Sequence, residues 1–286
     1  MTKTWTFGEV LSPVKVEDFL TGILGKSWLH LSGHSERFSS LLSWADINRM
    51  LCRSGLDLTR VHLSNQNGDV PTERFSTSAL SGFPCIRTAE LNQFLADGAV
   101  LAIDSAADMH EPILDLCRAV ERSLGVPIQA QIRCSCREMS SGAQSSEVHS
   151  YDHDIIVFEL LGAGIWSLQS EGGPGSASGA KDSPGPPDIE LKLRPGDLLY
   201  IPRGQQHSDR FLNEPSASIT VIFRNPTGVE ITARLFDRLK EADFLKPEVP
   251  RFATDDVQSA YLTVLQVEII RICTEPGLLL GFMRDL

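Results

Sequence analysis

The stretch RPGDLLYIPRGQQH, residues 194–207, decides the fold of this chain. It consists of a tight Pro-Gly-Asp turn, an apolar strand, a second turn and then His207. A second stretch, VHSYDHD over residues 148–154, places His149 just before another apolar strand. Two imidazoles at strand ends, together with one anionic group, are typical of a non-haem iron(II) site.

The middle of the chain is predicted to be a barrel or sandwich of short strands. Apolar or alternating runs, separated by Gly, Pro and Ser turns, occur over residues 126–137, 155–161, 165–168, 189–193, 197–201 and 217–223. Residues 170–187 (SEGGPGSASGAKDSPGPP) are low in complexity, which predicts a mobile loop that serves as a connector or as a lid.

Helical patterns flank these strands and divide the chain into three regions. Residues 1–97 carry amphipathic segments, which predict a mostly helical region that packs on the barrel. Residues 98–228 form the predicted barrel. Residues 229–286 have apolar helix faces, which predict a C-terminal helical region. Its strongly apolar ending, residues 277–282, is expected to pack back onto the core or to form a subunit contact.

Composition and charge exclude several classes of partner. A hydrophobic content of 42% and a charged content of 22% are those of a globular protein. A formal net charge of −11 argues against nucleic acid, because phosphate binding needs a basic surface. No apolar run is long enough for a membrane span, and the first residues lack the core of a signal peptide. Because the six cysteines show no zinc-type spacing, we expect a reduced, cytoplasmic protein.

The two histidine stretches resemble a known family. Residues 195–204, followed by His207, closely resemble the second metal-binding motif of the cupin-like JmjC oxygenases, which include the ribosomal oxygenases. Residues 149–154, ahead of an apolar strand, resemble the first motif. The resemblance implies a mainly β fold with helical flanks, a double-stranded β-helix of the cupin/JmjC jelly-roll type. It also implies Fe(II) and 2-oxoglutarate as cofactors, hydroxylation of a side chain, and a helical dimerisation region that fits residues 229–286.

The first motif departs from the family pattern. That motif is H-x-D, and its aspartate is the third metal ligand, but Tyr151 stands two residues after His149. In a regular strand His149, Tyr151 and His153 share one face, while Asp152 points to the other. Asp152 ligates only if a bulge turns it inward, and Tyr151 only as a phenolate. His153 as a third imidazole, or no third protein ligand, are the remaining alternatives. The predicted metal ligands are His149, His207 and Asp152, with Tyr151 as the alternative third ligand.

A second departure concerns the cosubstrate. Family members place a Lys or Arg just before the tryptophan of the next strand, where it pairs with the distal carboxylate of 2-oxoglutarate. In this chain Ile165 precedes Trp166. Because an unpaired carboxylate in a barrel interior is costly, either another cation replaces the missing one or the cosubstrate differs. Arg137 is the first candidate and Arg224 a weaker one. The predicted cosubstrate-binding residues are Arg137, Ser135 and Thr220.

These features predict an Fe(II)-dependent oxygenase, of the 2-oxoglutarate type, that acts on a peptide or protein side chain or on a small metabolite. One alternative is a catalytically degenerate JmjC-like barrel that acts as a binding module. Another is a metal-dependent oxygenase that does not use 2-oxoglutarate. The loss of the aspartate and of the cation favours the alternatives, whereas the two histidines favour the enzyme. We expect no membrane or nucleic-acid partner, and a homodimer formed through residues 229–286.

Overall fold

A computed structural model describes residues 4–65, 67–78, 84–136, 148–169, 189–212, 215–275, 277 and 281. The chain divides into two compact units, Met1–Arg224 and Asn225–Leu286. Three features selected from the sequence lie outside the described residues, namely Arg137, the low-complexity segment 170–187 and most of the apolar C-terminal end, residues 277–282.

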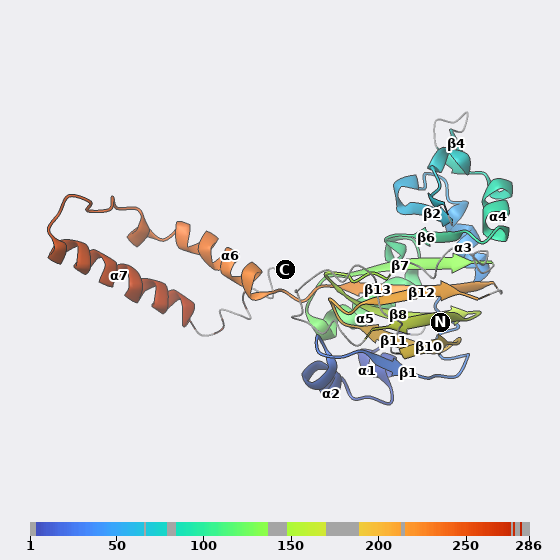
Figure 1. Ribbon diagram of the computed structural model, residues 1–286, viewed down its shortest axis with the longest axis horizontal. Helices are drawn as coiled ribbons and strands as arrows, with labels where there is room; N and C mark the ends of the chain where they lie inside the picture. Colours follow the sequence, from blue (N-terminus) through green and yellow to red (C-terminus); the bar gives the residue numbers. More distant parts are fainter. Residues whose placement is uncertain are drawn as a thin grey trace. The chain divides into compact units, whose positions relative to one another are not determined.

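The first unit is built on two antiparallel sheets (Figure 1). The larger sheet has the order β1 (Leu29–Leu31), β11 (Leu198–Ile201), β8 (Asp154–Leu161), β13 (Ser216–Phe223), β7 (Ile128–Ser135), β6 (Val100–Ile103), β2 (Val61–Asn65) and β3 (Gly68–Asp69). The smaller sheet has the order β10 (Ile189–Leu193), β9 (Gly164–Leu168) and β12 (His207–Phe211). The predicted jelly roll with helical flanks is confirmed. Of these strands, β12 is one that the sequence did not predict.

An apolar cluster connects the two sheets. It is made of buried side chains from β8, β9, β10 and β11, namely Ile155, Val157, Trp166, Leu168, Leu193, Leu199 and Ile201. Directly paired residues of an antiparallel ladder point to the same side of their sheet. His207 pairs with Leu168 and Asp209 pairs with Trp166, so both polar side chains face this interior. Thr220 pairs with Val157 and faces the interior from the larger sheet.

Residues 1–97 are mixed rather than mostly helical. Their helices are α1 (Phe7–Leu11), α2 (Val16–Asp18), the π-helical turn Phe19–Ile23, α3 (Trp44–Leu51) and α4 (Thr88–Ala96). The same region also supplies β1, β2 and β3 to the large sheet and the separate pair β4 (Ser76–Ser78) and β5 (Pro84–Ile86). In Figure 1, β1 lies at the β11 edge of the sheet, whereas β2, β4 and α4 lie beyond β6 at the opposite edge. Strands this short are too brief to show a periodic pattern in sequence.

Two helical boundaries of the first unit are set by local sequence signals. Ser43 caps α3, and its side chain and backbone exchange hydrogen bonds with Asp46 in a capping box. Helix α5 (Glu111–Leu124) packs on β7 and ends at Gly125, which adopts the left-handed conformation that glycine tolerates.

The turn that enters β11 is locked against the segment after β1. Gly196 has a φ of +95°, and a Cβ atom there would lie 2.0 Å from the carbonyl oxygen of His34. The carboxylate of Asp197 accepts hydrogen bonds from the backbone N–H groups of Gly33 and Arg194, each at 2.9 Å. The Pro-Gly-Asp turn is therefore structural, and it orients the strand that leads to His207.

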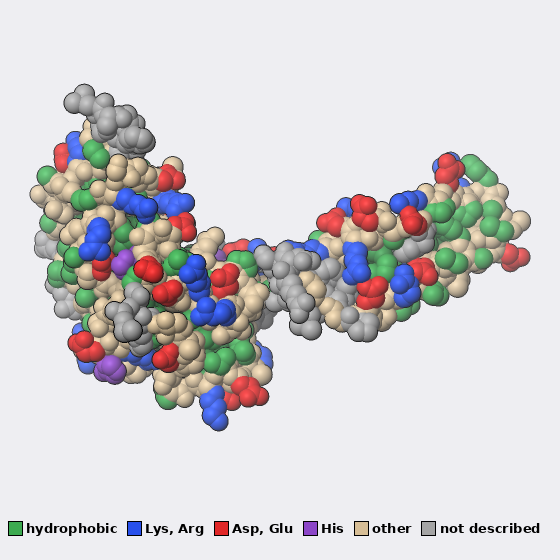
Figure 2. All heavy atoms as spheres, turned by 180° about the vertical axis from the view of Figure 1, so that it is seen from behind, with side chains coloured by type: hydrophobic (Ala, Val, Ile, Leu, Met, Phe, Trp, Pro, Cys, Tyr) green, Lys and Arg blue, Asp and Glu red, His purple; other side chains and the backbone are tan. Residues whose placement is uncertain are grey.

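The second unit consists of α6 (Gly228–Lys240), the 3₁₀ turn Asp243–Leu245 and α7 (Asp255–Cys273). Thr227 caps α6 through a capping box with Glu230. Figure 2 shows hydrophobic side chains between charged ones on this unit. Its large exposed apolar residues are Val229, Phe236, Val249, Phe252, Val257, Leu262, Val264, Val267, Ile269 and Ile270. None of the helices in the described ranges combines the length and the hydropathy of a membrane span.

Candidate metal centre

His149 and His207 lie opposite each other on an isolated antiparallel bridge. The backbone N–H of each residue donates a hydrogen bond to the carbonyl oxygen of the other, at 2.9 Å in both directions. Their ring centroids are 4.5 Å apart. The fold thus brings together the two histidines that the sequence selected as metal ligands.

His207 has the protonation state and the free lone pair that a metal ligand needs. Its Nδ1 lies 2.8 Å from the carbonyl oxygen of Gln205, and because a carbonyl only accepts, Nδ1 carries the proton. Nε2 is then unprotonated, is buried, and has no hydrogen-bond partner among the described residues. Burial lowers the pKa of His207 to about 4, so the imidazole is neutral near pH 7.

Tyr151 lies beside both histidines. Its ring centroid is 4.7 Å from that of His149 and 5.2 Å from that of His207. The backbone N–H of Gly204 donates to the carbonyl oxygen of Tyr151 at 2.9 Å, which ties the two histidine stretches together. Burial raises the pKa of Tyr151, so the side chain is a neutral phenol in the metal-free protein.

Asp152 turns away from this group. Its side chain is 77% exposed, lies 3.2 Å from Nδ1 of His153 and pairs with Arg224 at 3.7 Å. The hydrogen bond with His153 lowers the pKa of Asp152, which is therefore a solvated carboxylate in the metal-free protein. Within the described ranges, no three His, Cys, Asp or Glu side chains are already close enough together to hold a metal ion.

An arginine that was not among the selected residues lies between the two sheets. Arg133 of β7 donates a hydrogen bond from NH1 to Oδ2 of Asp209 on β12 at 2.7 Å. Arg133 sits directly opposite Ser218 in the ladder of β7 and β13. Strand alternation had placed Arg133 on the face of Ser135, and the i, i+2 spacing from His207 to Asp209 indicated a shared face, so both residues could have been found from the sequence.

The remaining predicted cosubstrate residues differ in their surroundings. Thr220 is buried and faces the interior. Ser135 is buried as well, but its hydroxyl donates a hydrogen bond to the carbonyl oxygen of Ala99 at 3.1 Å. Arg224 pairs with Asp152 at 3.7 Å. Of the predicted set, Thr220 is the described residue whose position suits a ligand inside the barrel.

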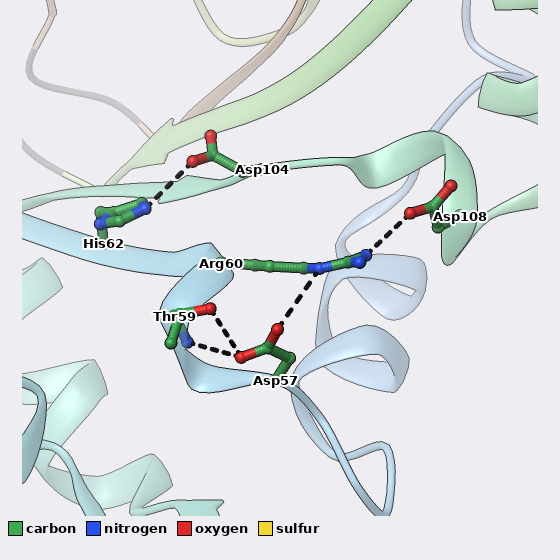
Figure 3. A network of polar contacts seen from close by, with 6 residues as sticks. All are labelled: Asp57, Thr59, Arg60, His62, Asp104 and Asp108. Atoms are coloured by element: carbon green, nitrogen blue, oxygen red, sulfur yellow. Dashed lines mark hydrogen bonds and ion pairs between the residues drawn. The ribbon is translucent and has the colours of Figure 1, made fainter.

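A second polar network lies elsewhere in the first unit (Figure 3). His62 Nε2 lies 3.0 Å from Asp104 Oδ2, and Arg60 donates to Asp108 at 2.8 Å. These groups are largely exposed, and exposed pairs of this kind contribute about 0–1 kcal/mol each to stability. The network joins the segment 57–62 to the segment 104–108.

The fold and the paired histidines define a cupin-like barrel with a candidate metal site, and the comparisons specify the class. Residues 117–231 match the family model described as "JmjC domain". This part of the chain is therefore similar to JmjC domains, and the predicted resemblance to the JmjC oxygenases is confirmed.

Two curated relatives have related names. The chain is 29% identical over 157 residues to "Ribosomal oxygenase 2" of Bos taurus, an alignment that covers 51% of this chain and 31% of the relative. It is 27% identical over 221 residues to "Bifunctional lysine-specific demethylase and histidyl-hydroxylase NO66" of Aedes aegypti, which covers 70% of this chain and 32% of the relative. The chain thus spans about a third of the length of these two relatives.

A solved structure shares the fold. It is described as YcfD, a ribosomal oxygenase from Escherichia coli, in complex with cobalt and 2-oxoglutarate. The TM-score is 0.60 at 20% identity, and the match covers 93% of this chain and 69% of the other. At this identity the likeness concerns the fold.

Proposed function

We propose that this chain is an Fe(II)- and 2-oxoglutarate-dependent oxygenase that oxidises a side chain of a protein or peptide. One observation carries the proposal. The lone pair on Nε2 of His207 is buried without a described hydrogen-bond partner, beside the imidazole of His149. An apolar cavity would not favour such an orphaned acceptor, but a metal ion satisfies it.

The residues present fit a metal held by two imidazoles. His149 and His207 would hold Fe(II), which when bound supplies oxygen activation at open coordination positions. Among the residues that the family's first motif offers as a third ligand, the ring contacts support Tyr151 over Asp152, because Asp152 is solvated and paired outside the pair of histidines. His153, whose ring stacks on Tyr151 at 4.7 Å, is a further alternative.

Protein side chains of the barrel would bind the cosubstrate and exclude water. The apolar cluster that contains Trp166 lies next to His207, whose ring stacks on that of Trp166 at 5.9 Å. Thr220 and Arg133 line the same interior, and Arg133 is the described cation that best suits a distal carboxylate. Arg137, predicted for that role, lies outside the described residues.

The substrate class follows from the relatives and from charge. The names of the two relatives include ribosomal oxygenase and histidyl-hydroxylase, which supports a protein substrate over a small metabolite. A net charge of −11 favours a neutral or basic target, because a negatively charged protein attracts cationic segments. We retain the three proposed regions, residues 1–97, 98–228 and 229–286, with the last as the contact of a homodimer.

A binding module without catalysis is the second candidate. Tyr151 occupies the position of the missing aspartate, and the described His, Cys, Asp and Glu side chains form no ready metal cluster. A barrel that has lost iron would retain its interior as a recognition surface.

Anaerobic titration with Fe(II), followed by addition of 2-oxoglutarate, tests these candidates. We expect one iron per chain and a charge-transfer absorbance band when 2-oxoglutarate is added. Absence of iron binding at stoichiometric metal would support the binding module. Iron binding without the band would indicate an oxygenase that uses another cosubstrate.

A further inference from the structure

The aspartate missing from the first histidine motif has a counterpart after the second histidine. His207-Ser208-Asp209 reads H-x-D, the pattern expected at residues 149–151, where Tyr151 now stands. On strand β12 the i, i+2 spacing places His207 and Asp209 on one face. Their ladder partners on β9, Leu168 and Trp166, belong to the apolar cluster, so this face points into the barrel.

Asp209 is a buried carboxylate held by a cation. Only 8% of the residue is exposed, and Arg133 donates to its Oδ2 at 2.7 Å. The guanidinium carbon of Arg133 also lies 5.7 Å from the ring centroid of Phe211, two residues further along β12. The pair thus joins β7 of the larger sheet to β12 of the smaller one, across the interior that contains His207.

Asp209 and Arg133 lie in the same interior as the paired histidines. Asp209 is two residues after His207 on one face of β12, and the ring of His207 lies 4.5 Å from that of His149. Arg133 contacts Asp209 from the facing sheet.

Compared with the family pattern, the chain lacks the aspartate at position 151 and the basic residue at position 165. It holds a different acid and a different base, Asp209 and Arg133, in the same interior. Arg133 on β7 pairs with Ser218 on β13, and Ser218 pairs in turn with Glu159 on β8. The three residues therefore form a row across three strands. A carboxylate buried beside an imidazole with an open lone pair is costly unless cations neutralise it, and a divalent metal ion is such a cation.

We propose that Asp209 supplies the carboxylate ligand of the metal site, and that Arg133 is the cation that receives the distal carboxylate of the cosubstrate. In the metal-free protein the two groups neutralise each other. On metal binding Asp209 turns from Arg133 towards His207, which requires rotation about its two side-chain torsions. This inference rests on the proposed function, and it differs from it by naming residues that the family pattern does not select.

Calorimetric titration with Co(II) tests the first half. The variants are Asp209→Asn, Arg133→Gln, Tyr151→Phe and Asp152→Asn, with His207→Ala as the reference for a lost ligand. Arg60→Gln and Asp108→Asn are matched controls, because they disrupt an Arg–Asp pair of 2.8 Å in the exposed network of Figure 3. Circular dichroism and thermal unfolding establish that each variant is folded.

We expect Asp209→Asn to weaken Co(II) binding about 100-fold or more, beyond the range of about 10–100-fold for residues that only support a ligand. Arg133→Gln should retain Co(II) affinity within about tenfold, because Asp209 keeps its charge. Asp209→Asn with less than about tenfold loss would overturn the proposal, as would equal losses in Asp209→Asn and Arg133→Gln, which would indicate a structural pair. If Tyr151→Phe or Asp152→Asn alone abolishes binding, that residue is the third ligand instead.

The second half is tested with Fe(II)-loaded protein under anaerobic conditions. We expect the 2-oxoglutarate concentration that gives half-maximal charge-transfer absorbance to be at least about tenfold higher in Arg133→Gln than in the wild-type protein. The amount of bound iron should be unchanged. An unchanged half-maximal concentration would reject the role of Arg133. Failure of the wild-type chain to bind Co(II), or unaltered binding in His207→Ala, would reject the proposed function itself, so the two failures are distinguishable.

Discussion

The Tyr200 hydroxyl donates a hydrogen bond to Oδ1 of Asp154 at 2.5 Å and thereby joins the two stretches that contain the histidines. Its oxygen also accepts from the backbone N–H of Gly25 at 2.7 Å. Burial raises the pKa of Asp154, against the effect of the bond from Tyr200. One phenol thus links β11, the start of β8 and the N-terminal segment.

Tyr200→Phe should therefore destabilise the first unit. The substitution leaves Asp154 without this donor and Gly25 without its acceptor, and an unsatisfied buried polar group costs about 1–3 kcal/mol. Urea unfolding followed by tryptophan fluorescence measures the loss. Tyr261→Phe, on α7, removes a hydroxyl that makes no hydrogen bond with the described residues and should cost less than about 0.5 kcal/mol. Equal effects of the two substitutions would contradict the role given to Tyr200.

Gly196→Ala should be severely destabilising. The new Cβ would lie 2.0 Å from a backbone oxygen of His34, at a φ of +95° that alanine rarely adopts. We expect a loss of more than about 3 kcal/mol in the free energy of unfolding, measured by urea unfolding. Gly22→Ala is the control, because a Cβ atom there meets nothing within 4 Å. A loss below about 1 kcal/mol for Gly196→Ala would show that the turn shifts freely.

The depressed pKa of His207 predicts a loss of stability in acid. The folded pKa is about 4 and the unfolded value about 6.5, so between these values the unfolded chain binds more protons. Stability from this group is complete above pH 6.5 and is lost as the pH falls towards 4, by up to about 3 kcal/mol. Asp209, Arg133 and His149 are the charged or titratable groups that modify this shift.

The measurement compares wild-type protein with His207→Leu in the presence of a chelator. For each protein, the change in the free energy of unfolding between pH 7 and pH 4.5 is measured. Subtracting the change in the variant from that in the wild-type protein removes the contributions of groups that titrate in both. The wild-type protein should lose more stability than the variant over this interval. Parallel curves would indicate that the imidazole is solvated in the metal-free protein.

The two candidate histidine ligands predict a metal-dependent gain in stability. An ion that binds only the folded state raises the melting temperature. Excess Co(II) should therefore raise the melting temperature of the wild-type protein but not that of His149→Ala or His207→Ala. His62→Ala is the control, because His62 pairs with Asp104 in the exposed network and should leave the gain intact. If the melting temperature still rises in both His149→Ala and His207→Ala, cobalt binds elsewhere.

The exposed apolar residues of α7 predict self-association through the C-terminal unit. Val267 is 58% exposed and Ile270 is 60% exposed, one turn apart on the same helix. Val267→Glu should shift the mass measured by light scattering from that of a dimer to that of a monomer. Gln266→Glu adds the same charge at the neighbouring exposed position and should leave the mass unchanged. A wild-type monomer at tens of micromolar protein would exclude this contact.

Much of the fold could be predicted from the sequence because its signals are local. The strand β10 was predicted at its observed bounds, and β7, β8, β9, β11 and β13 within two residues of theirs. Helix α5 is bounded by Pro112 in its first turn and by Gly125 at its end. Six strands were missed. Strands β1, β3, β4 and β5 have two or three residues, too few for a periodic pattern, and β2 (VHLSN) and β12 (HSDRF) contain more polar than apolar residues.

The candidate site could be predicted only in part, for the same physical reason. The motif pattern was enough to select His149, His207 and the position of Tyr151. It could not decide the direction of Asp152, which depends on His153 and Arg224 around it. Nor did it select Arg133 or Asp209. Strand alternation indicates the face on which each residue lies, but their pairing joins two sheets and has no local signature.

The sequence by itself determined the class of fold, the two histidines and the two departures from the family pattern, since each is a property of residues close together in the chain. The tertiary structure alone decided that His149 and His207 share a bridge, that Tyr151 rather than Asp152 lies beside them, and that Arg133 meets Asp209 inside the barrel. These contacts connect different strands, and their geometry follows from strand pairing and burial rather than from local sequence.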